Sequence, residues 1–178
     1  NCTVTDSFQL SVTPQLIAVL PNDTFICYQD TIPLNTQITG NGLGSLNYSW
    51  SPSGGLSDAL ALSPDAFPLD DTTYTFSMTD SLCSFTDSIL IKVNNQMFLS
   101  IVTNDTLICY GDTFQIKVDT SLVTGPKPLL FSWDISTGLD DTSIAEPYAY
   151  PTDTTLYSLF VVDTNGCSTL DSITIEVS

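Results

Sequence analysis

Short segments in which apolar and polar residues alternate run along the whole chain. The clearest are Phe8, Leu10 and Val12; Ile89, Ile91 and Val93; and Ile173, Ile175 and Val177, each separated by a single intervening residue. Alternation with period two predicts strands that bury one face. Apolar residues nowhere recur at helical spacing for three turns, and β-branched and aromatic residues dominate the segments. The pattern therefore predicts an all-β protein with almost no helix.

These three segments close a phrase that occurs three times: NCTVTDSFQLSVT at 1–13, LCSFTDSILIKVN at 82–94 and GCSTLDSITIEVS at 166–178. Other phrases recur in the same order, such as NDTFICYQDT at 22–31 and NDTLICYGDT at 104–113. The period of about eighty residues is typical of an array of small repeated domains. We therefore expect residues 1–13 to be the last strand of a preceding repeat, followed by complete repeats at 14–94 and 95–178.

Each predicted repeat contains around seven short strands, one early tryptophan and a tyrosine that opens a late strand. The tryptophans are Trp50 and Trp133, and the tyrosines are Tyr74 and Tyr157. This arrangement predicts tandem immunoglobulin-like β-sandwiches, with the tryptophans in the core and not on a sugar-stacking surface. The connections between repeats, TPQ at 13–15 and NNQ at 94–96, are short enough to restrict bending.

Charge and composition exclude several classes of function. The 178 residues carry 20 acidic and three basic side chains, no histidine and a net charge of −17. Nucleic acid and anionic lipid are therefore poor partners, and no apolar run approaches the ~18 residues of a membrane span. Without histidine there is no Ser/His/Asp or Cys/His arrangement, and although a carboxylate pair for glycoside hydrolysis stays open, no two aspartates are marked for it. We expect no enzymatic activity.

The five cysteines follow the repeat. Cys27 and Cys83 occupy the same positions as Cys109 and Cys167, and Cys2 corresponds to the second member of each pair. Repeat symmetry predicts the disulfides Cys27–Cys83 and Cys109–Cys167, with the partner of Cys2 in an upstream unit. Each bond would close a loop of over fifty residues and contribute about 4 kcal/mol in the chain-entropy model. Buried free thiols are the alternative, whereas a metal site lacks both histidine and close cysteine spacing.

Aspartates in turn-like segments are weak candidates for calcium binding, because hard oxygen ligands suit this ion. Neither the EF-hand spacing nor a glycine-rich nonapeptide is present, so solvated turn aspartates are the favoured interpretation and no cofactor is expected. The candidates are Asp58, Asp70, Asp71, Asp140, Asp141 and Asp153.

The phrases ICYGDT, YSW, P.DTT.Y and GC...DSI.I.V, met in this order and spacing, resemble the PKD-like and immunoglobulin-like tandem repeats of large secreted surface proteins of Bacteroidota, including gliding-motility-associated adhesins. The resemblance covers essentially the whole chain. Gln29 departs from the glycine usual in its turn, which leaves the type of that turn open in the first repeat.

The resemblance implies secretion by the type IX route, an extracellular cell-surface location and O-glycosylation at Asp-Ser or Asp-Thr sites followed by an aliphatic residue or threonine. Sites that fit this pattern are Thr31, Thr72, Ser81, Ser88, Thr106, Thr154 and Ser172.

The leading hypothesis is a non-enzymatic structural repeat of an adhesin stalk or surface filament, with neighbouring repeats as its partners. One alternative is a glycan- or surface-binding module in which Tyr28 and Tyr110 stack on sugars. Another is a filament subunit that polymerises by donating residues 1–13 as a strand to a neighbouring molecule.

Overall fold

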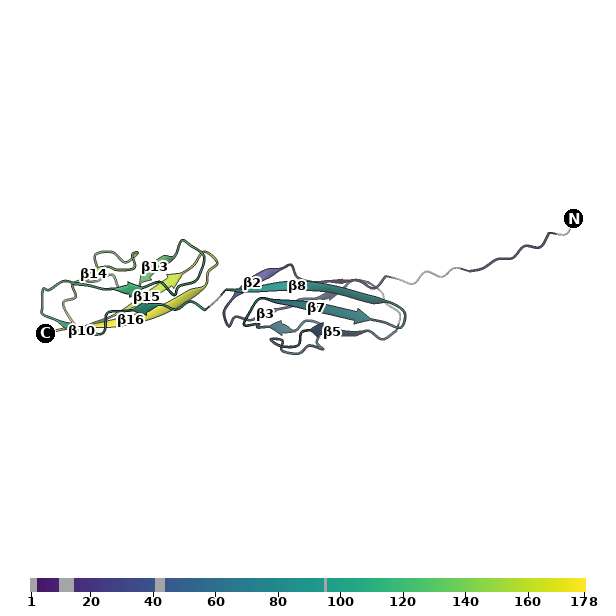
Figure 1. Ribbon diagram of the computed structural model, residues 1–178, viewed down its shortest axis with the longest axis horizontal. Coiled ribbons are helices and arrows are strands. Elements are labelled where there is room, and N and C mark those ends of the chain that lie inside the picture. Colours follow the sequence, from purple (N-terminus) through teal and green to yellow (C-terminus); the bar gives the residue numbers. More distant parts are fainter. Residues whose placement is uncertain (1–2, 10–14, 41–43, 95) are drawn as a thin grey trace. The chain divides into compact units, whose positions relative to one another are not determined.

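The computed structural model describes residues 3–9, 15–40, 44–94 and 96–178 (Figure 1). In these ranges every regular element is a β-strand. The chain divides into two compact units, Asn1–Val93 and Asn94–Ser178.

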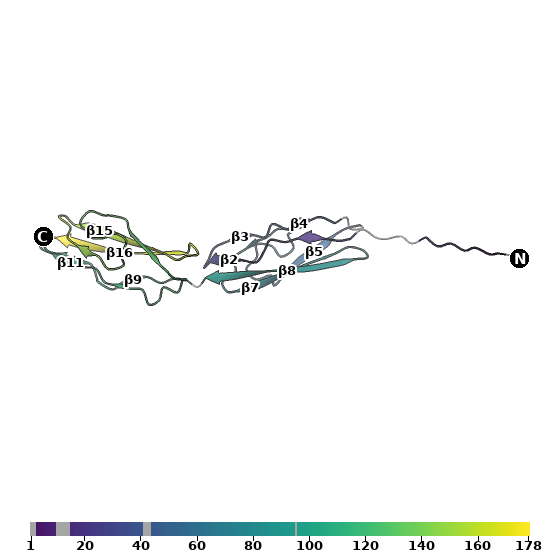
Figure 2. The same cartoon turned by 90° about the horizontal axis from the view of Figure 1, so that it is seen from above.

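The first unit is a sandwich of one four-stranded sheet and two small ladders. Its strands are β1 (Ala18–Val19), β2 (Thr24–Cys27), β3 (Ile32–Pro33), β4 (Gln37–Ile38), β5 (Asn47–Ser51), β6 (Asp65–Ala66), β7 (Thr72–Thr79) and β8 (Ser84–Asn94). The large sheet has the order β2-β8-β7-β5, and the ladders pair β1 with β4 and β3 with β6. Figure 2 shows β3 and β4 on one side of this unit and β7 and β8 on the other.

The second unit repeats this arrangement. Its strands are β9 (Ser100–Ile101), β10 (Thr106–Ile108), β11 (Phe114–Gln115), β12 (Val118–Asp119), β13 (Leu130–Trp133), β14 (Tyr148–Ala149), β15 (Thr155–Val162) and β16 (Ser168–Val177). The large sheet has the order β10-β16-β15-β13, and the ladders pair β9 with β12 and β11 with β14. The predicted tandem β-sandwich architecture is confirmed.

The alternating residues of the long hairpins form the two cores. Thr72–Thr79 pairs antiparallel with Ser84–Ile91, and Thr155–Val162 pairs in the same way with Ser168–Ile175. The inward side chains are at most 1% exposed: Tyr74, Phe76, Met78, Ile89 and Ile91 in one unit, and Tyr157, Leu159, Val161, Ile173 and Ile175 in the other. Period-two burial is therefore confirmed for these strands.

The two tryptophans pack in the cores. Trp50 is 3% exposed and Trp133 is 4% exposed. The Trp50 ring centroid lies 5.0 Å from that of Phe76. The indole N–H of Trp133 donates a hydrogen bond of 2.9 Å to the Ile144 carbonyl. Core packing was predicted over a sugar-stacking surface, and the burial confirms it.

The first occurrence of the repeated phrase differs from the other two. Among its described residues, 3–9, none belongs to a strand, and Val4 and Phe8 are 94% and 88% exposed. The same phrase forms β8 and β16, where neighbouring strands take up its backbone hydrogen bonds. A strand needs such a neighbour, and the described part of the chain provides none for residues 3–9.

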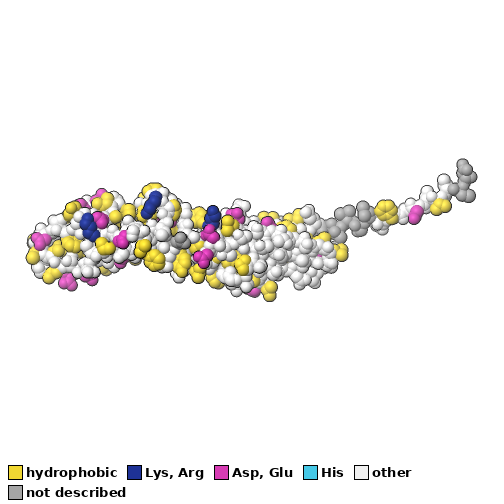
Figure 3. Space-filling view, in the orientation of Figure 1, with side chains coloured by type: hydrophobic (Ala, Val, Ile, Leu, Met, Phe, Trp, Pro, Cys, Tyr) yellow, Lys and Arg dark blue, Asp and Glu magenta, His cyan; other side chains and the backbone are white. Residues whose placement is uncertain are grey.

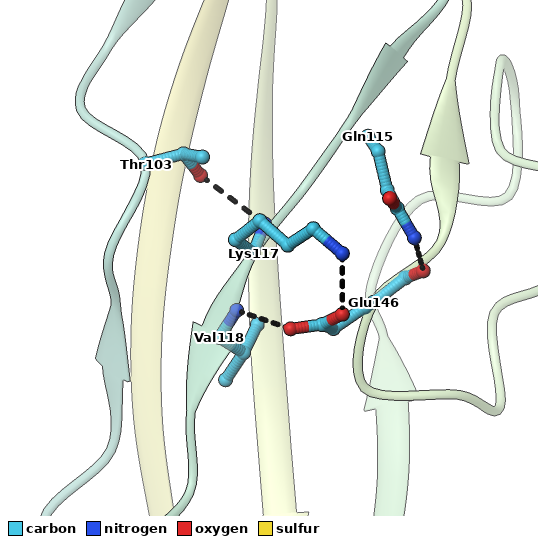
Figure 4. Close-up of polar contacts among 5 residues, drawn as sticks. All are labelled: Thr103, Gln115, Lys117, Val118 and Glu146. Atoms are coloured by element: carbon cyan, nitrogen blue, oxygen red, sulfur yellow. Dashed lines mark hydrogen bonds and ion pairs between the residues drawn. The ribbon is translucent and has the colours of Figure 1, made fainter.

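An ion pair fastens a loop of the second unit to the β11–β12 segment (Figure 4). The Lys117 ammonium lies 2.8 Å from the Glu146 carboxylate, whose second oxygen accepts a hydrogen bond from the Val118 amide. The hydrogen bond from Lys117 lowers the pKa of Glu146 below its usual value. Both side chains are more than a third exposed, so water screens the pair and its contribution to stability is small.

Candidate functional site: the cysteine turns

Each unit carries one cysteine at the end of a short strand, followed by a tight turn. We call these residues, Cys27 and Cys109, the turn cysteines. The Cys27 carbonyl accepts a 3.0 Å hydrogen bond from the Asp30 amide, and the Cys109 carbonyl accepts an equal one from Asp112. The third residue of the turn has a positive φ in both units, 68° at Gln29 and 89° at Gly111. The turn is therefore the same in both units, although the first has glutamine where the second has glycine.

The other described cysteines, Cys83 and Cys167, lie in the turn of the long hairpin and are called the hairpin cysteines. An aspartate holds each of these turns. The Asp80 carboxylate accepts 2.6 Å and 2.8 Å hydrogen bonds from the Cys83 and Leu82 amides. The Asp163 carboxylate, 3% exposed, accepts 2.9 Å and 2.8 Å bonds from the Cys167 and Asn165 amides. In both units, therefore, the hydrogen bonds to an equivalent aspartate hold the backbone of the hairpin cysteine in place.

Turn and hairpin cysteines of one unit lie at opposite ends of the same sheet. β10 runs parallel to β16, with Ile108 beside Val177, so Cys109 lies level with the end of β16 while Cys167 precedes its start. The first unit has the same register, because Asp23 accepts a hydrogen bond from the Leu90 amide as Asp105 does from Thr174. β8 has 11 residues and β16 has 10, so about 35 Å of strand separates the two cysteines in each unit.

The predicted pairs Cys27–Cys83 and Cys109–Cys167 are both wrong. A disulfide requires α-carbons within about 7 Å, far less than the length of β8 or β16. Cys109 is exposed and carries a free thiol, whereas Cys27 and Cys167 are disulfide-bonded. Repeat symmetry identified which positions are equivalent but not which ones meet. Cys2 lies outside the described residues.

The six aspartates considered for calcium do not form a cluster of ligands. Within the part of the chain that the structure describes, no three His, Cys, Asp or Glu residues are placed to hold a metal ion. Several of these carboxylates instead cap nearby backbone: Asp58 accepts from the Leu60 amide, Asp71 from Val93 and Asp140 from Tyr148, each at 2.8 Å. Hydrogen bonds from the Ser143 hydroxyl and amide lower the pKa of Asp141. The backbone of Asp70 and of Asp153 accepts a threonine hydroxyl two residues on.

Acidic side chains are scattered over the face of the molecule shown in Figure 3.

The residues predicted for O-glycosylation differ in exposure. Five are exposed and two are half-buried: Thr31, Ser81, Ser88, Thr154 and Ser172, against Thr72 and Thr106. Tyr28 and Tyr110 also differ, since Tyr110 is 72% exposed while Tyr28 is half-buried.

Among the residues that the structure describes, no helix is long and apolar enough to cross a membrane. No protein-family model matches the sequence, and no curated protein sequence matches it.

Solved structures of tandem immunoglobulin-type domains are similar to this chain. A variant of titin domains I67-I69 is 12% identical with a TM-score of 0.48, over 93% of this chain and 66% of that chain. Extracellular domains 3-5 of Drosophila OTK are 12% identical with a TM-score of 0.49, over 92% and 62%. Immunoglobulin domains 1-4 of Sidekick-1 are 12% identical with a TM-score of 0.43, over 93% and 49%. This chain thus spans less than two thirds of the length of these three solved chains.

Proposed function

We propose that the chain is a non-enzymatic structural repeat of an extracellular adhesin stalk or surface filament, which spaces or presents an adhesive region. The observation that carries this proposal is how little of the sequence lies between the two units: their boundary, between Val93 and Asn94, falls inside β8, and β9 begins at Ser100. Two sandwiches of one architecture with so short a connection suit a load-bearing array better than a set of independently moving binding domains.

The use of the polar and aromatic side chains supports the proposal. Trp50, Trp133, Tyr74 and Tyr157, the rings best suited to stack on a ligand, are buried in the two cores. Most of the turn aspartates bind backbone amides of their own unit, as Asp58, Asp71 and Asp140 do. These residues stabilise the fold of their own unit.

Location and modification belong to the same proposal. Disulfide-bonded cysteines favour an oxidising, extracellular compartment. The exposed serines and threonines named above leave room for O-linked glycans, and intact-mass measurement of the natively secreted protein tests for them.

Small-angle scattering tests the spacer role. The chain is compared with a variant that has a ten-residue Gly/Ser segment inserted after Asn95. A spacer predicts for the natural chain a maximum dimension of about two domains end to end, and a broader distance distribution for the variant. A compact particle, or identical curves for both proteins, would contradict it.

A second candidate function is surface or glycan binding, which the exposed ring of Tyr110 favours. A glycan array read with the natural chain, with Tyr110→Ala and with Tyr28→Ala as the half-buried control tests it. Binding that only Tyr110→Ala removes supports a binding module. Absence of binding by the natural chain contradicts it.

A further inference from the structure

The large sheet of the second unit carries a cluster of apolar side chains on its outer face, which is the face turned away from the core. Phe160 of β15 lies directly opposite Leu170 of β16, and Leu130 of β13 lies opposite Val162, the next outward residue of β15. Leu130, Phe160 and Leu170 are 65%, 43% and 54% exposed, and Val162 is half-buried. Neighbours across and along paired strands cover one continuous area, so we call these four residues the outer patch.

The first unit has the same strands in the same register, but its outer face is polar at all four places. Asn47 opposite Thr79 corresponds to Leu130 opposite Val162. Ser77 opposite Thr86 corresponds in the same way to the pair of Phe160 and Leu170. The sandwich therefore forms without apolar residues at these places, and the outer patch needs an explanation other than the stability of the fold.

The distribution of charge favours a second copy of this chain as the occupant of the outer patch. The chain has a net charge of −17. Of the outward-facing residues in β10, β13, β15 and β16, all four of which the structure describes in full, only Glu176 is charged. A basic partner would need carboxylates around the patch. Two copies repel each other over most of their surface, and a face without carboxylates is where they can approach.

The two ends of β13 carry opposite charges, which suits a two-fold arrangement. The exposed Lys127 precedes the strand by three residues, and Asp134 follows it directly. The Asp134 carboxylate accepts a 2.9 Å hydrogen bond from the Ser158 amide, which ties it to the neighbouring strand. If a two-fold axis runs across the strands, β13 of one copy crosses β13 of the other in the opposite direction. Lys127 of each copy then lies at the end where the other copy has Asp134.

We propose that two copies of the chain form a dimer by packing these faces together, outer patch on outer patch, with their β13 strands antiparallel. The exposed fractions correspond to roughly 350 Å² of apolar surface, which is within the range of the largest patches on monomeric proteins. Two patches with their surroundings would bury roughly 1,000 Å², the size of a weak and reversible interface. The dimer should therefore dissociate on dilution.

Sedimentation velocity from about 10 μM to about 1 mM protein measures this equilibrium, because a weak dimer dissociates within that range. The expected mass is 19.3 kDa in dilute solution and rises toward twice that value in concentrated solution. The dimer should be more stable in about 0.5 M than in about 0.05 M salt, since salt screens the repulsion between the two acidic chains. A mass of 19.3 kDa at every concentration and salt, or growth beyond two copies, would overturn the proposal.

The first unit supplies substitutions that the fold accepts. Phe160→Ser and Leu130→Asn each introduce the residue that the first unit has at the equivalent place. Each should raise the dissociation constant at least about tenfold, because every dimer loses two buried apolar side chains. Leu122→Ser is the matched control, a 59% exposed leucine of the same unit that lies in the turn after β12, and it should change nothing. Equal weakening by the control would contradict the use of the outer patch.

The orientation has its own test. Lys127→Glu should raise the dissociation constant by about two- to fivefold, because the glutamate would face Asp134 of the second copy. An unchanged dissociation constant would overturn the antiparallel arrangement.

Hydroxyl-radical footprinting of the natural chain gives a result that does not depend on any variant. Oxidation of Phe160 and Leu170 should fall several-fold between dilute and concentrated samples, whereas oxidation of Leu122 should stay the same. Equal oxidation of Phe160 and Leu170 at both concentrations would show that the outer patch stays open, and it would overturn the proposal even if the variants failed to fold.

Discussion

The hydroxyl of Tyr74 donates a 2.9 Å hydrogen bond to the carbonyl of Gly54, in the loop between β5 and β6. In the second unit, Tyr157 donates a 3.0 Å bond to the Thr137 carbonyl in the corresponding loop. Both side chains have no exposed surface. In each unit, therefore, a buried tyrosine packs in the core, and its hydroxyl anchors a loop.

Replacing Tyr74 with phenylalanine should destabilise the first unit by about 0.5–1.5 kcal/mol, because the hydrogen bond from the buried tyrosine hydroxyl to the Gly54 carbonyl is lost while the ring packing stays. Urea unfolding followed by fluorescence measures the change. Tyr110→Phe is the matched control, since its ring is 72% exposed and water can replace its hydrogen bonds. Equal effects of the two substitutions would contradict a structural role for the Tyr74 hydroxyl.

Stability should fall at alkaline pH because of the same two tyrosines. Burial raises the pKa of Tyr74 above its ordinary value of 10.0, and burial is also the main cause of the raised pKa of Tyr157. The folded state therefore holds these protons more tightly than the unfolded state does. The stabilisation is complete below pH 10 and is lost as the pH rises through the higher folded values. Unfolding free energies measured from pH 8 to 11 should decline less steeply above pH 10 in Tyr74→Phe and Tyr157→Phe; parallel curves would refute this origin.

Gly55 and Tyr74 should show strong coupling in a double-mutant cycle. Gly55 has a φ of 72°, and a Cβ there would lie 2.6 Å from the Tyr74 hydroxyl oxygen and 3.1 Å from the Pro68 α-carbon. Gly55→Ala should therefore cost about 2–4 kcal/mol in the natural chain. In the Tyr74→Phe background the cost should be smaller by about 1 kcal/mol, because the closest clash is gone. Additive effects would show that the positive φ and the approach to Pro68, and not the Tyr74 hydroxyl, require the glycine.

Much of this core could be read from the sequence, because one-sided burial leaves a mark at every second residue. The alternation of Tyr74, Phe76 and Met78 and its copy at Tyr157, Leu159 and Val161 identified the inward faces of the long hairpins. The sequence also shows that the motif containing Gly55 recurs at Gly138. Only the structure shows why a glycine is needed there: its φ is positive and a tyrosine hydroxyl lies where a Cβ would be.

The cysteine pairing could not be read in the same way. Repetition shows that Cys27 and Cys109 are equivalent, and this is compatible with bonds inside units or between them. A bond inside one unit is excluded because β2 and β10 lie parallel to the last strand of their unit. This placement separates the two cysteines of the unit by the full length of β8 or β16. Local patterns carry no signal for the direction in which two distant segments pair.

The turn after β2 should become more stable when Gln29 is replaced by glycine. Gln29 has a φ of 68°, a region that costs a residue with a side chain about 1 kcal/mol, and Gly111 occupies the equivalent place without that cost. Gln29→Gly should raise the unfolding free energy by a few tenths to about 1 kcal/mol, and Gly111→Gln should lower it by about 1 kcal/mol. Thermal melts of both variants measure this pair of opposite shifts. Destabilisation by Gln29→Gly would mean that side-chain contacts of Gln29 outweigh its backbone strain.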